Sequence, residues 1–193
     1  MSETTRAAFT VEWRRPSTDE RIVEGIAVPW NETSFLTPDP AGERFLPGSL
    51  TRSVKARGPR LKLFRNHDHG TAIGVFRAAD AKHDDGLWLS WRIGSTAAGN
   101  AALEEIAEGL LDAFSIGFRT IKARRGGDGA REIVEADIHE CSLAPIGAYD
   151  GARVLAVRAP TFGVAEITAW MAQHPIPAVS RVPIPDLSRY SRR

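Results

Sequence analysis

Residues 113–144 read AFSIGFRTIKARRGGDGAREIVEADIHECSLA, and they carry the strongest strand pattern of the chain. Apolar and polar residues alternate from Ala113 to Ala123 and again from Ile133 to Ala144, a period of two that is typical of β-strands. The glycine-rich segment Gly126–Gly129 lies between them and favours a turn. The stretch therefore predicts two long strands joined by a tight connection.

Shorter elements are predicted on both sides of this pair. A short helix is expected from Leu50 to about Ala56, and a longer one begins at Ser95 or Thr96. The longer helix is predicted to carry one apolar stripe made of Leu103, Ile106, Ala107, Leu110 and Leu111. Runs of β-branched and apolar residues that predict further strands occur at 22–28, 61–64, 73–77, 87–93 and 153–158.

These elements predict an α+β fold, namely a mainly antiparallel β-sheet or small β-barrel with two or three helices on its outside. The chain has 193 residues, of which 42% are hydrophobic, and this suits one globular core with additional ends. We expect a polar N-terminal segment at 1–20, one folded domain at 21–158 and a flexible, proline-rich C-terminal tail at 159–193.

Composition excludes several classes of function. Net charge is +1, from 25 basic and 24 acidic residues, so bulk electrostatic binding to nucleic acid is not expected. No apolar run approaches the roughly 20 residues of a membrane helix. The N-terminus also lacks the features of a secretory signal, which predicts a cytosolic product. Cys141 is the only cysteine, so intramolecular disulfides and thiolate-rich metal sites are excluded.

Ser115 is the first candidate for chemistry. On an alternating strand, Phe114, Ile116 and Phe118 share one face, which is expected to be core, and Ser115, Gly117 and Arg119 share the other. That second face offers a hydroxyl, a gap that allows a close backbone approach, and a cation able to hold an anion. An ordinary serine on a half-exposed strand fits the same pattern.

Glu140 is the second candidate, because it falls on the more apolar face of its strand with Ile138 and Ser142. A carboxylate there is costly unless a cationic or hydrogen-bonding group meets it. A catalytic imidazole and a structural arginine are both possible partners. A β-bulge would exchange the two faces and make His139 the inward residue.

The histidine of such a site is expected at His67 or His69, which flank Asp68 at the end of a predicted strand, where functional groups are commonly displayed. Two alternatives stay open. His67, His69 and His83 could instead form a metal site, although no recognisable ligand spacing supports it, and no metal or other cofactor is predicted. Cys141 could act as a nucleophile, but its apolar surroundings favour a buried residue.

With these residues in view, the chain resembles the prohead maturation proteases of tailed phages (caudoviruses), which are distantly related to the herpesvirus assemblins. The resemblance runs from about Val23 to Val157. It rests on five blocks in the family's order: EGIAVPW at 24–30, ERFLPGSL at 43–50, NHD at 66–68 followed by IG at 73–74, FSIGF at 114–118 and ECSLAP at 140–145.

The resemblance implies an assemblin-like fold and a serine endopeptidase that cuts scaffold or capsid-protein segments, and usually itself. It implies Ser115 as the nucleophile, His67 as the general base and Glu140 as the third member, with the adjacent His139 as a competitor. The implied partners are the phage major capsid protein and its scaffold segment, and a homo-oligomer stays open. The implied place of action is the assembling procapsid in the host bacterial cytoplasm. An inactive scaffold or assembly chaperone of the same fold is the alternative.

The chain departs from the family pattern after its last block. Assemblins follow that strand with an arginine pair that helps to bind the oxyanion, whereas residues 144–153 contain no such pair. The remaining candidates for oxyanion or substrate binding are the backbone N–H near Gly147, the side chain of Arg153, and Gly117 with Arg119. The tail after Ala159 is the region in which self-cleavage is expected, because a flexible and exposed segment is accessible to a protease.

Overall fold

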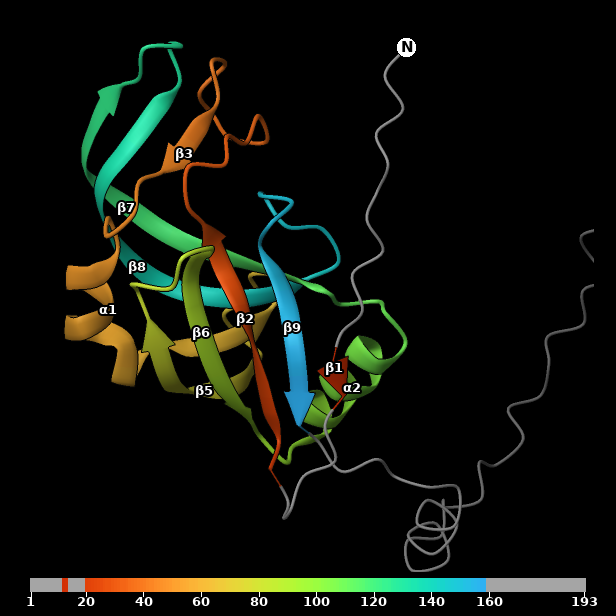
Figure 1. Ribbon diagram of the computed structural model, residues 1–193. Helices are drawn as coiled ribbons and strands as arrows, with labels where there is room; N and C mark the ends of the chain where they lie inside the picture. The colour runs from red at the N-terminus through yellow and green to blue at the C-terminus, as the bar shows by residue number, and fades with distance from the viewer. Residues whose placement is uncertain (1–11, 14–19, 159–193) are drawn as a thin grey trace, which may run out of the picture. The chain divides into compact units, whose positions relative to one another are not determined.

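The computed structural model of the chain describes residues 12–13 and 20–158 (Figure 1). The predicted tail and its cleavage region, residues 159–193, lie outside the described residues, so the domain boundaries stay predictions. Within the described part of the chain, no helix is long and apolar enough to cross a membrane.

The described elements are mostly strands. Two α-helices and one short 3₁₀ turn complete them: α1 (Thr51–Arg57), the 3₁₀ turn Gly58–Arg60 and α2 (Ala97–Ala107). The strands are β1 (Glu12–Trp13), β2 (Ile22–Pro29), β3 (Glu43–Phe45), β4 (Lys62–Arg65), β5 (Ala72–Asp80), β6 (Gly86–Ile93), β7 (Ala113–Arg125), β8 (Arg131–Ala144) and β9 (Arg153–Arg158).

Seven of the described strands close into a barrel in the order β9, β2, β6, β5, β4, β8 and β7. The seam is closed by two backbone hydrogen bonds, from Phe114 N–H to the carbonyl of Ala152 at 3.2 Å and from Val154 N–H to the carbonyl of Asp112 at 2.8 Å. Closure removes the exposed edges that an open sheet would leave. The predicted mainly antiparallel small barrel is confirmed, although β4 and β8 run parallel.

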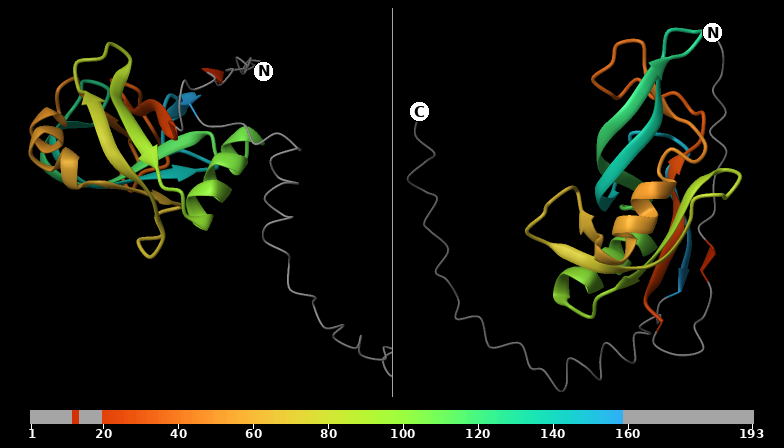
Figure 2. Two further views of the ribbon diagram at one scale, coloured as in Figure 1. Left: turned by 90° about the horizontal axis from the view of Figure 1, so that it is seen from below. Right: turned by 90° about the vertical axis from the view of Figure 1, so that its left-hand side faces the viewer.

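The barrel is filled by large side chains, and its helices lie outside it. Trp91, Phe45 and Phe114 are completely buried. Figures 1 and 2 show α1 and α2 on opposite flanks of the strands. Helix α1 is fixed to β8 because the hydroxyl of Ser53 accepts a hydrogen bond from the N–H of Ile138 at 2.8 Å.

Helix α2 is shorter than the sequence pattern predicted. It ends at Ala107 because Gly109 adopts a φ of +71°, a conformation that glycine adopts at little cost. The N–H of Leu110 then bonds to the carbonyl of Glu105 at 2.7 Å and that of Gly109 to Ile106 at 3.0 Å, which is a Schellman ending. Leu110 is consequently 61% exposed and does not belong to the buried stripe.

Gly25 allows β2 and β9 to approach closely. A Cβ atom on Gly25 would lie 2.1 Å from the carbonyl oxygen of Arg153, whereas a Cβ on Gly127 would have nothing within 4 Å. We therefore expect Gly25→Ala to lower the free energy of unfolding by about 2–3 kcal/mol and Gly127→Ala to change it by less than about 0.5 kcal/mol. Urea denaturation measures both. Equal midpoints for the two variants would contradict the close approach.

Candidate active site

Strand β8 lies between β4 and β7, and this arrangement builds the site. Ser142 of β8 is opposite Phe64 of β4 on one side and opposite Ser115 of β7 on the other. Two residues earlier on β8, Glu140 is opposite Gly117. Side chains that follow β4 and side chains on β7 therefore meet over Glu140 and Ser142.

The loop after β4 delivers His67 in an unusual backbone conformation. Asn66 and His67 have φ angles of 52° and 59°, in the left-handed region that Asn and His adopt more readily than most residues. The loop is tied to β8, because Asn66 N–H donates to the carbonyl of Leu143 at 2.9 Å and His67 N–H donates to the hydroxyl of Ser142 at 3.1 Å. Such conformations concentrate at functional sites, where surrounding contacts hold them.

Asp68 stabilises the remainder of this loop. Its carboxylate accepts hydrogen bonds from the hydroxyl of Thr71 at 2.8 Å and from the N–H of Gly70 at 2.9 Å. These hydrogen bonds hold the pKa of Asp68 below its ordinary value, and the one from the Thr71 hydroxyl has the larger effect. Asp68 thus shapes the turn that follows His67.

His67 joins Glu140 and Ser115 into one chain of contacts. Nδ1 of His67 lies 2.6 Å from Oε1 of Glu140, and Nε2 lies 3.0 Å from Oγ of Ser115. An ionised carboxylate only accepts hydrogen bonds, so Nδ1–H donates to Glu140 and Nε2 is left to accept from Ser115. The side chain of Glu140 is 5% exposed and that of His67 is 45% exposed. The acid is therefore buried, while the imidazole remains accessible.

Ser142 is a member of the site that the sequence reasoning missed. Its hydroxyl donates to Oε2 of Glu140 at 2.8 Å and accepts from the backbone N–H of His67. Both oxygens of the buried carboxylate therefore have a hydrogen-bonding partner. The available signal was its position two residues after Glu140, on the same face of the strand.

Gly117 makes room for Glu140. A Cβ atom at this position would lie 2.7 Å from Oε1 and 3.0 Å from Cγ of Glu140. The strand pattern predicted that a backbone approaches this gap, but the neighbour is instead the side chain of Glu140. Any larger residue here displaces the carboxylate that holds His67.

The other site residues that the sequence suggested are His139, Arg119, Arg153 and Gly147, whereas the two ring nitrogens of His67 contact Glu140 and Ser115. A bulge, which the sequence left open as an alternative, is present, since the register between β7 and β8 skips His139. It does not turn His139 inward, because His139 is exposed while Glu140 is buried. Arg119 forms an ion pair with Asp137 at 3.3 Å. Arg153 pairs with Ala113 across the barrel seam. A Cβ on Gly147 would lie 3.2 Å from the carbonyl of Phe114, so the loop after β8 lies against the start of β7.

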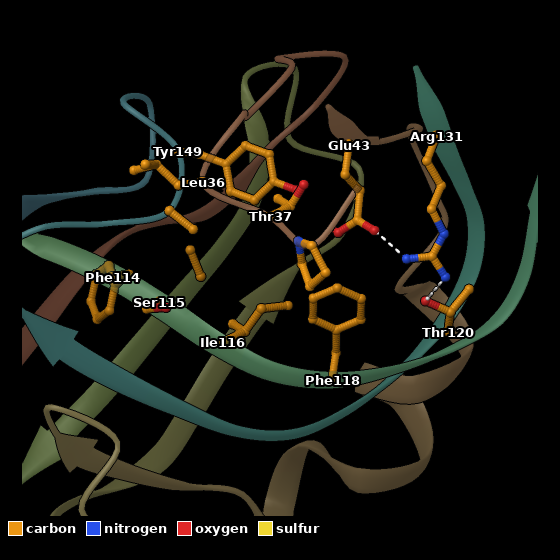
Figure 3. A pocket seen from close by; sticks show the side chains of 13 residues that line it. Leu36, Thr37, Glu43, Phe114, Ser115, Ile116, Phe118, Thr120, Arg131 and Tyr149 are labelled. Carbon is orange, nitrogen blue, oxygen red and sulfur yellow. Dashed lines mark hydrogen bonds and ion pairs between the residues drawn. The ribbon is translucent and has the colours of Figure 1, made fainter. Parts of the chain in front are cut away.

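A cavity of about 340 Å³ opens beside Ser115 (Figure 3). Ile116 and Phe118 are only partly buried and line this cavity, whereas the strand pattern placed both in the core with Phe114. The rings of Phe118 and Phe45 meet edge to face at 4.8 Å, so Phe118 connects the cavity wall to the barrel core.

Comparison with known proteins identifies the family. Residues 9–163 match the family described as caudovirus prohead serine protease. The chain belongs to this family. No curated protein matches it at a significant level.

Solved structures are similar to this prohead protease at low identity. KSHV protease, solved in complex with a hexapeptide phosphonate inhibitor, has a TM-score of 0.50 and 15% identity over 80% of this chain and 75% of that chain. The capsid assembly protease of bacteriophage T4 has a TM-score of 0.42 and 14% identity over 72% of this chain and 82% of that chain. The first of these similarities confirms the predicted assemblin-like fold.

The three histidines of the metal alternative have other neighbours in the prohead protease. His67 contacts Glu140 and Ser115, the ring of His69 lies 5.1 Å from that of Phe64, and Nδ1 of His83 accepts from the N–H of Asp85. Among the residues that the structure describes, no group of three or more His, Cys, Asp or Glu side chains could hold a metal ion.

Cys141, the other potential nucleophile, is sealed inside the barrel. It is completely buried, and burial followed by the negative charge of Glu140 raises the pKa of its thiol well above the ordinary value. Since the thiolate is the reactive form, we expect iodoacetamide at pH 7.5 to leave the native protein unmodified and to alkylate it fully in guanidinium chloride. Intact-mass spectrometry measures both. Rapid alkylation of the native protein would reopen a cysteine mechanism.

Proposed function

We propose that this prohead protease is a serine endopeptidase in which Ser115 is the nucleophile, His67 the general base and Glu140 the group that orients His67. The observation that carries the proposal is the pair of contacts on one imidazole, 2.6 Å to Glu140 and 3.0 Å to Ser115. Both are within hydrogen-bond reach, which is the first geometric requirement of a nucleophile, a base and an orienting group.

In the proposed mechanism, Oγ of Ser115 attacks the carbonyl carbon of the scissile peptide bond while Nε2 of His67 takes the hydroxyl proton. The tetrahedral intermediate collapses, and Nε2 gives this proton to the departing amine, which leaves an acyl group on Ser115. Water then attacks the acyl carbon with His67 again as base. The acid product leaves, and the proton returns to Ser115.

Glu140 supports this sequence without accepting the proton itself. Its carboxylate fixes the tautomer with hydrogen on Nδ1 and stabilises the imidazolium that forms during each attack. Backbone N–H groups of the loop that contains Gly147 are the proposed oxyanion donors, because this loop lies against the residue that precedes Ser115. Arg153 remains the alternative donor for the oxyanion.

The proposed substrates are scaffold or capsid-protein segments inside the assembling procapsid in the host cytoplasm, together with the protease's own tail. Family membership supports a role in capsid maturation. An inactive scaffold or assembly chaperone of the same fold is disfavoured, because a chain without catalytic function has no need to hold His67 between Glu140 and Ser115.

The nucleophile and base can be tested with a fluorophosphonate, in which the serine oxygen bonds to phosphorus and fluoride leaves. We expect wild type to be labelled at Ser115, Ser115→Ala to show no label, and His67→Ala to react at least about 10³-fold more slowly. His69→Ala and His139→Ala are matched controls that should react within threefold of wild type. Peptide mapping locates the label. A labelled Ser115→Ala, or a His139→Ala as slow as His67→Ala, contradicts the assignment.

Ser142 should matter for rate as well as stability. Ser142→Ala leaves one oxygen of Glu140 and the N–H of His67 without their partner, so fluorophosphonate labelling should slow about 10- to 100-fold. Ser90→Ala is the matched control, because Ser90 is also fully buried and its hydroxyl donates to Glu24, but it lies on β6, which pairs with neither β7 nor β8. If both variants label like wild type, Ser142 has no part in positioning.

Self-cleavage predicts a difference in mass between two purified proteins. Wild type incubated at high concentration should lose a segment from the region after Ala159, whereas Ser115→Ala should keep its full mass of 21.1 kDa. Intact-mass spectrometry over a time course measures this loss. The same truncation in Ser115→Ala would assign the cut to a contaminating protease, and full-length wild type would remove self-cleavage from the proposal.

A further inference from the structure

The cavity beside Ser115, here called the Ser115 pocket, is lined by both apolar and polar side chains. Leu36, Pro38, Ile116 and Phe118 contribute the apolar lining. Figure 3 shows Tyr149, Thr37 and Glu43 around the same space, with Ser115 at its margin. A cavity that adjoins a nucleophile and combines apolar walls with a few polar groups has the form of a side-chain specificity pocket.

Two hydroxyls of this pocket have no hydrogen-bonding partner among the described residues. The side-chain oxygens of Thr37 and Tyr149 are buried, and neither forms a hydrogen bond with another group in the described part of the chain. Buried polar atoms are rarely left unpaired in folded proteins, since each costs about 1–3 kcal/mol. Both residues line the pocket, so a ligand that enters it can supply the missing partners.

Among the described residues that line the pocket, one is acidic and one is basic, namely Glu43 and Arg131, and they form an ion pair with each other. Glu43 is only 2% exposed, and Arg131 also donates to the hydroxyl of Thr120 at 2.9 Å. Burial raises the pKa of Glu43 even though Arg131 opposes this effect. Burial and the nearby charge of Glu43 also raise the pKa of Tyr149. Its hydroxyl therefore stays protonated and is able to donate as well as accept.

We infer that the Ser115 pocket receives the substrate side chain immediately before the scissile bond and selects an uncharged one with an apolar stem and an amide end, namely glutamine. This inference rests on the proposed function of Ser115. The amide N–H groups can donate to Glu43 and to one hydroxyl, and the amide oxygen can accept from the other hydroxyl. The methylene stem lies against the apolar walls.

Other side chains meet a specific cost in the same pocket. A glutamate end is repelled by the buried carboxylate of Glu43, and a lysine end places a second positive charge beside Arg131. A purely apolar side chain such as methionine fits the walls but leaves the hydroxyls of Thr37 and Tyr149 unpaired. A site built to hydrogen-bond a polar group strongly disfavours analogues that lack that group.

Four short peptidyl diphenyl phosphonates test this inference, with glutamine, methionine, glutamate or lysine side chains at the position next to phosphorus. In the full chain, the Ser115 oxygen bonds to phosphorus and displaces phenoxide. The rates of this modification, compared among the four probes, show which side chain the pocket prefers, and the natural substrate need not be known. We expect the glutamine probe to react about 10-fold faster than the methionine probe and about 100-fold faster than the glutamate probe. The lysine probe should also be slower than glutamine.

The variants Tyr149→Phe and Thr37→Val each remove one hydroxyl and preserve shape. Each should reduce the glutamine-to-methionine rate ratio to about threefold or less. The methionine probe should react at least as fast with each variant as with wild type, because each variant removes a hydroxyl that methionine leaves unpaired. Such a rate shows that the fold and Ser115 are intact.

A methionine, glutamate or lysine probe that matches or exceeds glutamine overturns the inference, as does an unchanged ratio in both variants. These results leave the proposed function standing if a simple fluorophosphonate still labels Ser115. Failure of every probe and of the fluorophosphonate removes the proposed function, and the inference with it.

Discussion

The arrangement of the site depends on how the buried carboxylate of Glu140 is satisfied. An ionised carboxylate away from water costs several kcal/mol unless hydrogen bonds or a cation compensate it. Glu140 obtains these contacts from Nδ1 of His67 on one oxygen and from the hydroxyl of Ser142 on the other. Gly117 on the neighbouring strand leaves the space that the carboxylate occupies. The same contacts therefore stabilise the buried acid and hold the imidazole in the orientation that the proposed catalytic role requires.

Barrel topology makes this arrangement possible for residues that are far apart in the chain. His67 and Ser115 are 48 positions apart, and His67 and Glu140 are 73 positions apart. Strand β8 brings them together because it pairs with β4 on one side and β7 on the other. The barrel seam between β7 and β9 then holds the start of β7, where Ser115 lies. His67 comes from a loop whose left-handed backbone is retained by hydrogen bonds to β8, so its position is set by the sheet and not by the loop alone.

Much of this was predictable from sequence, because period-two alternation and turn residues are local signals. The long strands of 113–144 and the inward position of Glu140 rest on such signals, whereas the roles of His67 and Ser115 came from the resemblance of five sequence blocks to a known family. What the sequence did not reveal depends on long-range geometry. The parallel pairing of β4 with β8 and the three-residue β3 have no local pattern, and the end of α2 was missed because the Leu110–Leu111 periodicity outweighed the signal of Gly109. The role of Ser142 depends on the backbone N–H of a residue 75 positions away. The hydroxyls of Thr37 and Tyr149, which have no partner within 12–13 and 20–158, likewise become visible only when the loops around Ser115 are placed.

We propose that Glu140, His67 and Ser115 form one proton-transfer unit. The most direct test is to determine which ring nitrogen of neutral His67 carries the hydrogen. Nitrogen NMR of the chain labelled with ¹⁵N-histidine, assigned by comparison with a His67→Gln variant, distinguishes the two ring nitrogens at a pH where the ring is neutral. We expect hydrogen on Nδ1, held by Glu140, and an unprotonated Nε2 that accepts from Ser115. A neutral ring with its hydrogen on Nε2 would contradict the proposal, because that imidazole has no lone pair facing the serine.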